Sequence, residues 1–427
     1  MSIILALLIF SAVILFHELG HFLLAKKNKI VVTEFSLGMG PRLYSTVIKG
    51  TRYSLKAFPL GGSCAMLGED TADEEKGTFH AASVWGRISV VAAGPVFNFI
   101  LALIFATVIV ALAGYDPAEI MGVKEGSSAE QAGLQEGDII TEFQGYHIDL
   151  GRDLYVYTYL NEVTSDSISM KVRRDKETIE ICFQPDENIR YLLGFNRSDS
   201  SSMKVESLIS GLPLEEAGVQ PGDVITGING VKIENGEDFD AYLAEHPLSG
   251  TPVDILYERD GLEYEAQITP AKYSSPDMGF SYNVGSVKAR GLQVLKYGLV
   301  EVKYMIRTTL LSLKELVTGG LGMEDLSGPV GVVDAIGQTY EQSKSEGARI
   351  VLLNMLNMVV LLSANLGVMN LLPIPALDGG RLVFLVLEAV RRKPVNREIE
   401  GRIHFAGLML LMMLMVFVMY NDIMKLI

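Results

Sequence analysis

Four apolar stretches constrain this chain more than any other feature of its sequence. They run from Ser2 to about Ala25, from about Ile88 to Ala113, from about Ile350 to Leu372 and from about Phe405 to Tyr420. A helix needs about 20 mainly apolar residues to cross a bilayer. The mean hydropathy of +0.28 agrees with a chain that places much of its length in lipid. The sequence therefore predicts a polytopic α-helical membrane protein with four transmembrane helices.

The distribution of basic residues predicts how these spans are oriented. Lys and Arg are frequent in the loop after the first span, at residues 26–87, and in the loop between the third and fourth spans, at residues 381–402. Short loops rich in Lys and Arg stay in the cytoplasm, and four spans place both loops on one side. We therefore expect a multi-pass protein of the inner or plasma membrane. Its termini and the segment between the second and third spans should be extracytoplasmic.

That intervening segment is strongly acidic. Residues 115–290 contain 32 acidic and 14 basic residues, a net charge of −18, whereas the whole chain carries −15. The two flanking blocks together are therefore close to neutral. An acidic surface of this kind repels a phosphate backbone, so we do not expect nucleic acid as a partner. The sequence predicts a soluble extracytoplasmic block between two membrane blocks.

An internal repeat divides the acidic block into copies at residues 123–140 and 208–225. The equivalent positions lie at one constant offset: Ala132-Gly133 with Ala217-Gly218, and Gly137-Asp138 with Gly222-Asp223. Each copy is typical of a strand, a short helix with a C-cap glycine, a Gly-Asp turn and a second strand. The pattern resembles the PDZ domain, which binds peptides by strand addition. Peptide C-termini are therefore candidate ligands, and the alternative is a pair of spacers or steric filters.

Two further segments are neither spans nor ordinary loops. Residues 31–67 alternate apolar and polar side chains between Gly and Pro, which predicts short strands or hairpins. Such a membrane-associated β-hairpin region either dips into the bilayer beside a buried site or lies at the cytoplasmic surface. Residues 291–317 are periodic but too charged to span a bilayer. They predict an amphipathic helix on the outer membrane surface.

The first span contains the sequence His17-Glu18-Leu19-Gly20-His21. On a helix, His17 and His21 lie on one face about one turn apart. Both imidazoles can then bind one zinc ion while Glu18 acts as general base. Ionisable residues inside a membrane span are costly and mark functional sites. The motif therefore predicts a Zn²⁺ site with two histidine ligands and a catalytic glutamate.

A catalytic zinc needs a third protein ligand and one open position. His147 and His246 belong to the acidic block and are out of reach of the first span. Asp378 follows the third span, at the cytoplasmic end and at the expected depth of the two histidines, and Pro373 and Pro375 break the helix before it. Taken alone, this segment could be a turn capped by Asp378. Beside the His-Glu-x-x-His span, we interpret Asp378 as the third ligand.

These motifs together resemble the site-2 protease family of zinc intramembrane metalloproteases. The resemblance rests on His17-Glu18-x-x-His21 in the first span, Leu377-Asp378-Gly379 late in the chain, the PDZ copies between them, Ala93-Gly-Pro-Val-Phe-Asn98 and Ser327-Gly-Pro-Val-Gly331. With its tandem PDZ pair, the chain is similar to the bacterial members of this family, which process anti-sigma factors. The resemblance implies a substrate-positioning role for Asn370. Arg381 stands where some members of the family carry His.

The resemblance also implies a function, namely cleavage of the transmembrane segments of single-span membrane proteins such as anti-sigma factors or signal-peptide remnants. Another protease usually trims the outer part of the substrate first. The expected partners are therefore membrane-protein substrates and the lipid bilayer. A membrane-anchored PDZ scaffold without activity would not explain why four residues of a metal site lie at one depth in the membrane. These residues are His17, Glu18, His21 and Asp378. A transporter would require two repeated membrane halves with broken helices, which the sequence lacks.

The expected domain order follows from these segments. Residues 1–114 form a first membrane block with two spans and the hairpin region, and residues 115–188 and 189–273 form two PDZ domains. Residues 274–349 form a linker with the surface helix, and residues 350–427 form the second membrane block.

Overall fold

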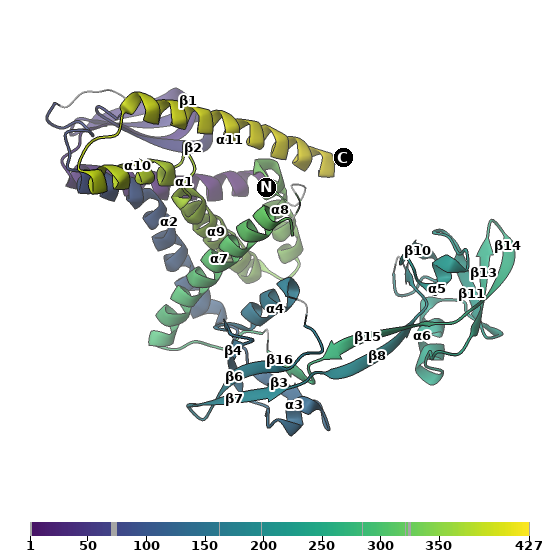
Figure 1. Cartoon of the computed structure of the whole chain (residues 1–427). Helices are drawn as coiled ribbons and strands as arrows, with labels where there is room; N and C mark the ends of the chain where they lie inside the picture. Colours follow the sequence, from purple (N-terminus) through teal and green to yellow (C-terminus); the bar gives the residue numbers. More distant parts are fainter. Residues whose placement is uncertain are drawn as a thin grey trace. The chain divides into compact units, whose positions relative to one another are not determined.

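The computed structural model describes residues 2–69, 75–161, 163–197, 199–283, 285–320, 322 and 326–426. The chain forms two compact units (Figure 1). One consists of Met1–Tyr115 with Gly285–Ile427, and the other of Asp116–Val284. The first unit contains the long apolar helices, and the second contains the internal repeat.

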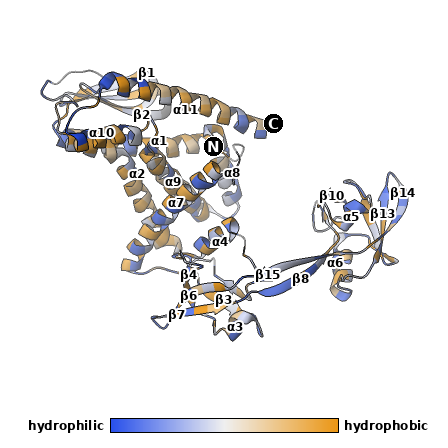
Figure 2. Ribbon diagram, viewed as in Figure 1, coloured by the Kyte–Doolittle hydropathy of each residue, from blue (hydrophilic) through white to orange (hydrophobic). Residues whose placement is uncertain are grey.

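Four helices in the described part of the chain are long and apolar enough to cross a membrane. They are α1 (Ser2–Lys27), α2 (Val84–Ala113), α9 (Ala348–Leu371) and α11 (Arg397–Leu426). Figure 2 shows that hydrophobic residues predominate along these helices, whereas the strands and helices of the second unit are more hydrophilic. The four predicted spans are confirmed.

The first unit is assembled around α2. This helix packs against α1 and α9, and also against α7 (Leu292–Thr318) and α10 (Asp378–Arg391). Small side chains permit the close packing, since Ala102 and Ala106 of α2 are buried against α7 and α9. The helix expected near residues 291–317 is therefore confirmed as α7. Its placement on the outer membrane surface stays a prediction.

Helix α8 (Pro329–Lys344) packs against α1 and α9 and is held at its N-terminus by α11. The backbone N–H groups of Gly328 and Gly331 donate to the Asp422 carboxylate over 3.1 and 2.8 Å. A carboxylate at this position satisfies free N–H groups and complements the helix dipole. The contact fixes the start of α8 against the last turns of α11.

The chain breaks sharply after α9, as the two prolines predicted. Helix α9 ends at Leu371 and α10 begins at Asp378. Between them Ala376 has a left-handed φ of 76°, and its N–H donates to His404 Nδ1 of α11 over 2.9 Å. Gly379 is required here because an added Cβ would lie 2.1 Å from the carbonyl oxygen of Leu372. The turn therefore places Asp378 at the first position of α10, a helix that the sequence did not predict.

The predicted hairpin region is confirmed as a small sheet. Strands β1 (Val32–Ile48) and β2 (Thr51–Met66) both bend, so that four segments pair in the order 42–48, 51–56, 34–37 and 62–66. Residues 62–66 are an edge of this sheet, and β2 packs against α1. The sheet is therefore attached to the helix that contains the histidine motif.

In the second unit the two copies of the repeat have the same order of elements. The first consists of β3 (Ile120–Val123), α3 (Ser128–Gln131), β4 (Ile139–Phe143), β5 (Tyr146–His147), α4 (Gly151–Leu160), β6 (Ile168–Arg174) and β7 (Glu177–Phe183). The second consists of β10 (Val205–Leu208), α5 (Pro213–Glu216), β11 (Val224–Ile228), β12 (Val231–Lys232), α6 (Gly236–Glu245), β13 (Val253–Arg259) and β14 (Leu262–Ile268). Each copy has a four-stranded antiparallel sheet and its own apolar core.

The Gly-Asp turn of the repeat has the same structural role in both copies. Asp138 forms an ion pair of 2.7 Å with Arg174 at the end of β6, and Asp223 forms one of 2.7 Å with Arg259 at the end of β13. Both aspartates are buried. The repeated sequence thus encodes a repeated buried ion pair that ties the turn to the sheet.

One strand pairing was not expected from the sequence. Strand β16 (Phe280–Tyr282) follows the second copy in the chain but pairs with β3 of the first, in the way that β9 (Phe195–Arg197) pairs with β10 in the second. An antiparallel ribbon of β8 (Asp186–Leu192) and β15 (Ala271–Asp277) connects the two copies. The second copy is therefore inserted between two segments of the first. The domain boundaries at residues 188 and 273 stay a prediction, and the pairing places residues 280–282 with the first copy.

Candidate metal centre

Helix α1 places its two histidines on a buried face. His17 and His21 are each 8% exposed, one turn apart, and their rings meet edge to face with centroids 4.8 Å apart. The i and i+4 spacing directs both side chains to the same side of the helix. The two Nε2 atoms lie 3.2 Å from each other.

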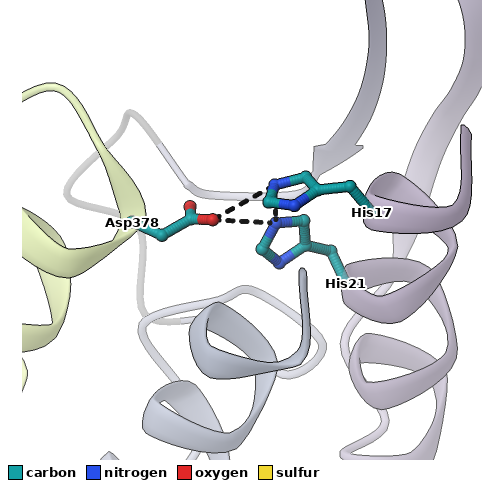
Figure 3. Close-up of side chains that lie close together, drawn as sticks. All are labelled: His17, His21 and Asp378. Atoms are coloured by element: carbon teal, nitrogen blue, oxygen red, sulfur yellow. Dashed lines mark hydrogen bonds and ion pairs between the residues drawn. The ribbon is translucent and has the colours of Figure 1, made fainter. Parts of the chain in front are cut away.

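Asp378, at the start of α10, completes a cluster with these histidines (Figure 3). Its Oδ2 atom lies 3.2 Å from His17 Nε2 and 3.4 Å from His21 Nε2. Bonds of about 2.0–2.1 Å in a tetrahedral zinc site separate neighbouring ligand atoms by about 3.3 Å. The triangle of two imidazole nitrogens and one carboxylate oxygen therefore fits Zn²⁺ and leaves a fourth position for water. The structure brings together all three ligands predicted from the sequence.

Two glycines allow α1 and α2 to approach closely at this site. An added Cβ on Gly20, inside the His-Glu-x-x-His motif, would lie 2.4 Å from the carbonyl oxygen of Ala93. On the facing helix, an added Cβ on Gly94 would lie 2.3 Å from His21 Nε2 and 2.7 Å from a ring carbon of His17. Gly94 therefore leaves the space that the two rings fill. Its role was not predicted from the sequence.

Helix α2 also contacts the ring nitrogens that face away from the cluster. His21 Nδ1 lies 2.8 Å from the carbonyl oxygen of Val90, and His17 Nδ1 lies 3.1 Å from the side-chain amide of Asn98. Asn98 is fully buried. In the sequence it is the last residue of the motif Ala93-Gly-Pro-Val-Phe-Asn98, and a polar residue inside an apolar span is usually functional.

Glu18 lies beside the cluster, between the two histidines in sequence. The backbone of Cys64, on the edge strand 62–66, lies next to its carboxylate. The neighbouring Gly62 packs on it, since an added Cβ there would lie 3.1 Å from Glu18 Cγ. The described metal cluster consists of His17, His21 and Asp378 and does not include Glu18. This placement agrees with a base that is not a ligand.

Asn370 is the one predicted site residue that stands apart from this network. It lies near the end of α9 and its side chain is half-buried. None of the hydrogen bonds formed by the described part of the chain involves its amide. Its substrate-positioning role stays a prediction.

Two ion pairs fix α10, the helix that begins with Asp378. Arg87 of α2 donates two hydrogen bonds of 3.1 and 2.6 Å to Glu388, and both side chains are largely buried. Arg381 forms an ion pair with Glu69, which follows the edge strand. Arg381 therefore orients α10.

Comparison with known proteins agrees with this geometry. The sequence profile of peptidase family M50 matches residues 5–414. The chain belongs to peptidase family M50. The zinc metalloprotease RasP of Geobacillus kaustophilus is 30% identical to this chain. The alignment covers 99% of this chain and 98% of that relative. The regulator of sigma-W protease RasP of Bacillus subtilis is also 30% identical, and the alignment covers 100% of this chain and 99% of that relative.

A solved PDZ domain of HtrA3 bound to a phage-derived ligand covers 21% of the chain at 16% identity, with a TM-score of 0.18.

Family membership confirms part of what the sequence predicted for this M50 peptidase. It is a multi-pass membrane zinc metalloprotease, and zinc is its cofactor. The expected class of fold, with four apolar helices, a hairpin region and two repeated copies of strands and helices that each have their own apolar core, is confirmed as well. The roles of the individual site residues and the orientation in the membrane stay predictions.

Proposed function

We propose that this M50 peptidase cleaves the transmembrane segments of single-span membrane proteins inside the bilayer, in regulated intramembrane proteolysis. The observation that carries the proposal is the position of His17 and His21. Both lie within α1, a helix with the length and hydropathy of a membrane span. A peptide bond that reaches them has to enter the hydrocarbon region, where transmembrane segments are the available substrates.

The proposed mechanism assigns one role to each group. When bound by His17, His21 and Asp378, zinc polarises the scissile carbonyl and lowers the pKa of its water. Glu18 takes the proton of the attacking water and passes it to the leaving amine. The Asn370 amide donates to the carbonyl oxygen as negative charge develops there.

The substrate has to be extended at the scissile bond, because helical amides are hidden by their own hydrogen bonds. Residues 62–66 form a sheet edge whose backbone reaches Glu18 through Cys64. A substrate strand added to this edge would lie next to the general base. The position of this edge favours a hairpin region that lies at the depth of the site over one confined to the cytoplasmic surface.

The substrate class can be narrowed further. The Bacillus subtilis relative is described as a regulator of sigma-W. We propose that the substrates of this chain are anti-sigma factors or signal-peptide remnants whose outer part has already been removed. The two PDZ-like copies lie outside the cell in this proposal, and the metal site lies near the cytoplasmic face. Their function is to exclude substrates that retain a bulky outer domain, and the alternative is that they bind a new C-terminus.

A reconstituted assay tests the proposed activity. Purified protein and a single-span substrate with a short outer tail are placed in one proteoliposome, and the cleavage position is read by mass spectrometry. We expect cleavage within the transmembrane segment and none with Glu18→Gln. Cleavage confined to soluble segments, or equal cleavage by both proteins, would show that the proposed function is wrong.

The structure also defines how to test the filter. Tyr115 and Val287 exchange backbone hydrogen bonds of 2.9 and 2.7 Å, so residues 116–286 begin and end at one point. Replacing them with a short Gly-Ser turn removes both copies intact, including β3 and β16. The shortened enzyme should still cleave trimmed substrates and should gain cleavage of untrimmed ones. Loss of cleavage of trimmed substrates by the folded, zinc-loaded variant would identify the copies as a required docking module.

A further inference from the structure

Three positions of α2 face the two histidines with a regular spacing. Val90, Gly94 and Asn98 are four residues apart and therefore lie on one face of the helix. Val90 is next to His21 and Asn98 is next to His17, as expected for two antiparallel helices. Gly94 lies between them and provides space for both rings. The face thus has a hydrogen-bonding group, a gap and a second hydrogen-bonding group.

The chemistry of imidazole determines what these two groups have to do. Each Nε2 atom faces the cluster with Asp378, so a metal bound there takes the lone pair of Nε2. A neutral imidazole then carries its proton on Nδ1, which becomes a hydrogen-bond donor. Metal-binding histidines usually donate this N–H to a carboxylate, a carbonyl or water, which fixes the ring and its tautomer. The carbonyl oxygen of Val90 is such an acceptor for His21.

For His17 the corresponding group is the amide of Asn98. Its Nδ2 atom lies 3.1 Å from His17 Nδ1, and its Oδ1 atom is buried without a partner among the described residues. With the proton on Nδ1, two donors would face each other. Turning the amide about its last torsion places Oδ1 against the imidazole N–H and restores a donor and an acceptor.

We propose that Asn98 is a positioning residue of the metal centre. Its Oδ1 accepts the hydrogen bond from His17 Nδ1–H and selects the tautomer in which Nε2 binds the metal. This inference rests on the proposed role of His17 as a ligand. Asn98 is fully buried beside His17. The Ser363 hydroxyl of α9 donates to the main-chain carbonyl of Asn98 over 2.8 Å and not to its side-chain amide.

The test compares variants by their affinity for zinc, measured on the metal-free full-length protein in detergent with a competing chelator. Asn98→Leu keeps the size of the side chain and removes the acceptor, so zinc affinity should fall about 10- to 100-fold. Asn98→Asp restores an acceptor and should bind zinc within a few-fold of wild type. Ser363→Ala is the matched control, because it removes a hydrogen bond to the same residue without touching the side-chain amide. Its zinc affinity should not change.

The outcomes separate this inference from the proposed site. If His17→Ala lowers zinc affinity but a folded Asn98→Leu does not, His17 is a ligand and the role given to Asn98 is wrong. If His17→Ala leaves the affinity unchanged, the ligand set itself is wrong. Should Asn98→Leu fail to fold, ¹⁵N NMR of the histidine-labelled, zinc-loaded wild type decides the question. We expect protonated Nδ1 in both ligand histidines, and a proton on Nε2 of His17 would overturn the inference.

Discussion

A single methyl group on Gly94 should disable the metal centre. In Gly94→Ala the new Cβ would lie 2.3 Å from His21 Nε2 and 2.7 Å from a ring carbon of His17. Non-bonded atoms of this kind settle at about 3.5 Å, so the imidazole of His21 has to move by about 1 Å. Helix α1 cannot move with it to preserve the site, because α10 and its Asp378 are held to α2 by the ion pair between Arg87 and Glu388.

A shift of this size exceeds what a zinc site tolerates. Zinc–ligand distances vary by about 0.2 Å in functional sites, and a displacement of about 1 Å at a catalytic centre costs about 100-fold in rate. We therefore expect Gly94→Ala to retain less than one tenth of the wild-type zinc affinity and about one hundredth of the cleavage rate. The assay is chelator competition for zinc, followed by cleavage of a reconstituted single-span substrate.

Gly401→Ala on α11 is the matched control for this variant. It is the same substitution in a helix, but an added Cβ at Gly401 has no heavy atom within 4 Å. It should leave zinc binding and cleavage unchanged, since alanine is the better helix former. If Gly94→Ala is folded and retains full zinc affinity and full activity, the packing of α1 against α2 that we describe is wrong.

Three further substitutions test the surroundings of the site and the second unit. Asp378→Ala should remove most of the bound zinc, measured as moles of metal per mole of protein; full metal and full rate would exclude Asp378 as a ligand. Arg87→Met leaves the Glu388 carboxylate buried and unpaired, which should lower the free energy of unfolding by about 3–5 kcal/mol, as measured by thermal unfolding. Adding Glu388→Leu should restore much of this stability, and an equally unstable double variant would contradict the role given to the ion pair. Because the Arg259 guanidinium lowers the pKa of Asp223, their ion pair stabilises the second copy above about pH 4 and is lost as pH falls through the native pKa. Asp223→Asn should therefore speed hydrogen exchange in β11–β14 at neutral pH, and this effect should shrink as the pH falls below about 4; an effect independent of pH would refute the assignment.

The spans and the cluster of His17, His21 and Asp378 could be predicted because their signals are local. An apolar stretch of sufficient length has few alternatives to a membrane helix, and the spacing of His17 and His21 requires only that the segment be helical. Asp378 was predicted because two prolines mark the end of the third span. In each case a short stretch of sequence is enough to predict where the residues lie.

Other features depend on how distant segments pack, which no local pattern specifies. The roles of Gly94 and Asn98 follow from the register of α1 against α2. Helix α10 is short and amphipathic, and its sequence is typical of a loop rich in basic residues. The ion pair between Arg87 and Glu388 that fixes this helix is a contact between distant segments, which the local sequence does not show. The pairing of β16 with β3 joins segments separated by the whole second copy. Such long-range pairings are set by tertiary contacts rather than by strand propensity.

The central claim is that Glu18 acts as the base beside a zinc ion that it does not bind. Glu18→Gln keeps the shape of the side chain and removes its ability to take a proton. The direct measurement determines zinc per mole and the cleavage rate of a reconstituted single-span substrate on the same preparation of this variant. We predict one zinc ion per chain, as in the wild type, together with a cleavage rate reduced by about 100-fold or more. Retained turnover, or loss of zinc together with activity, would contradict the account.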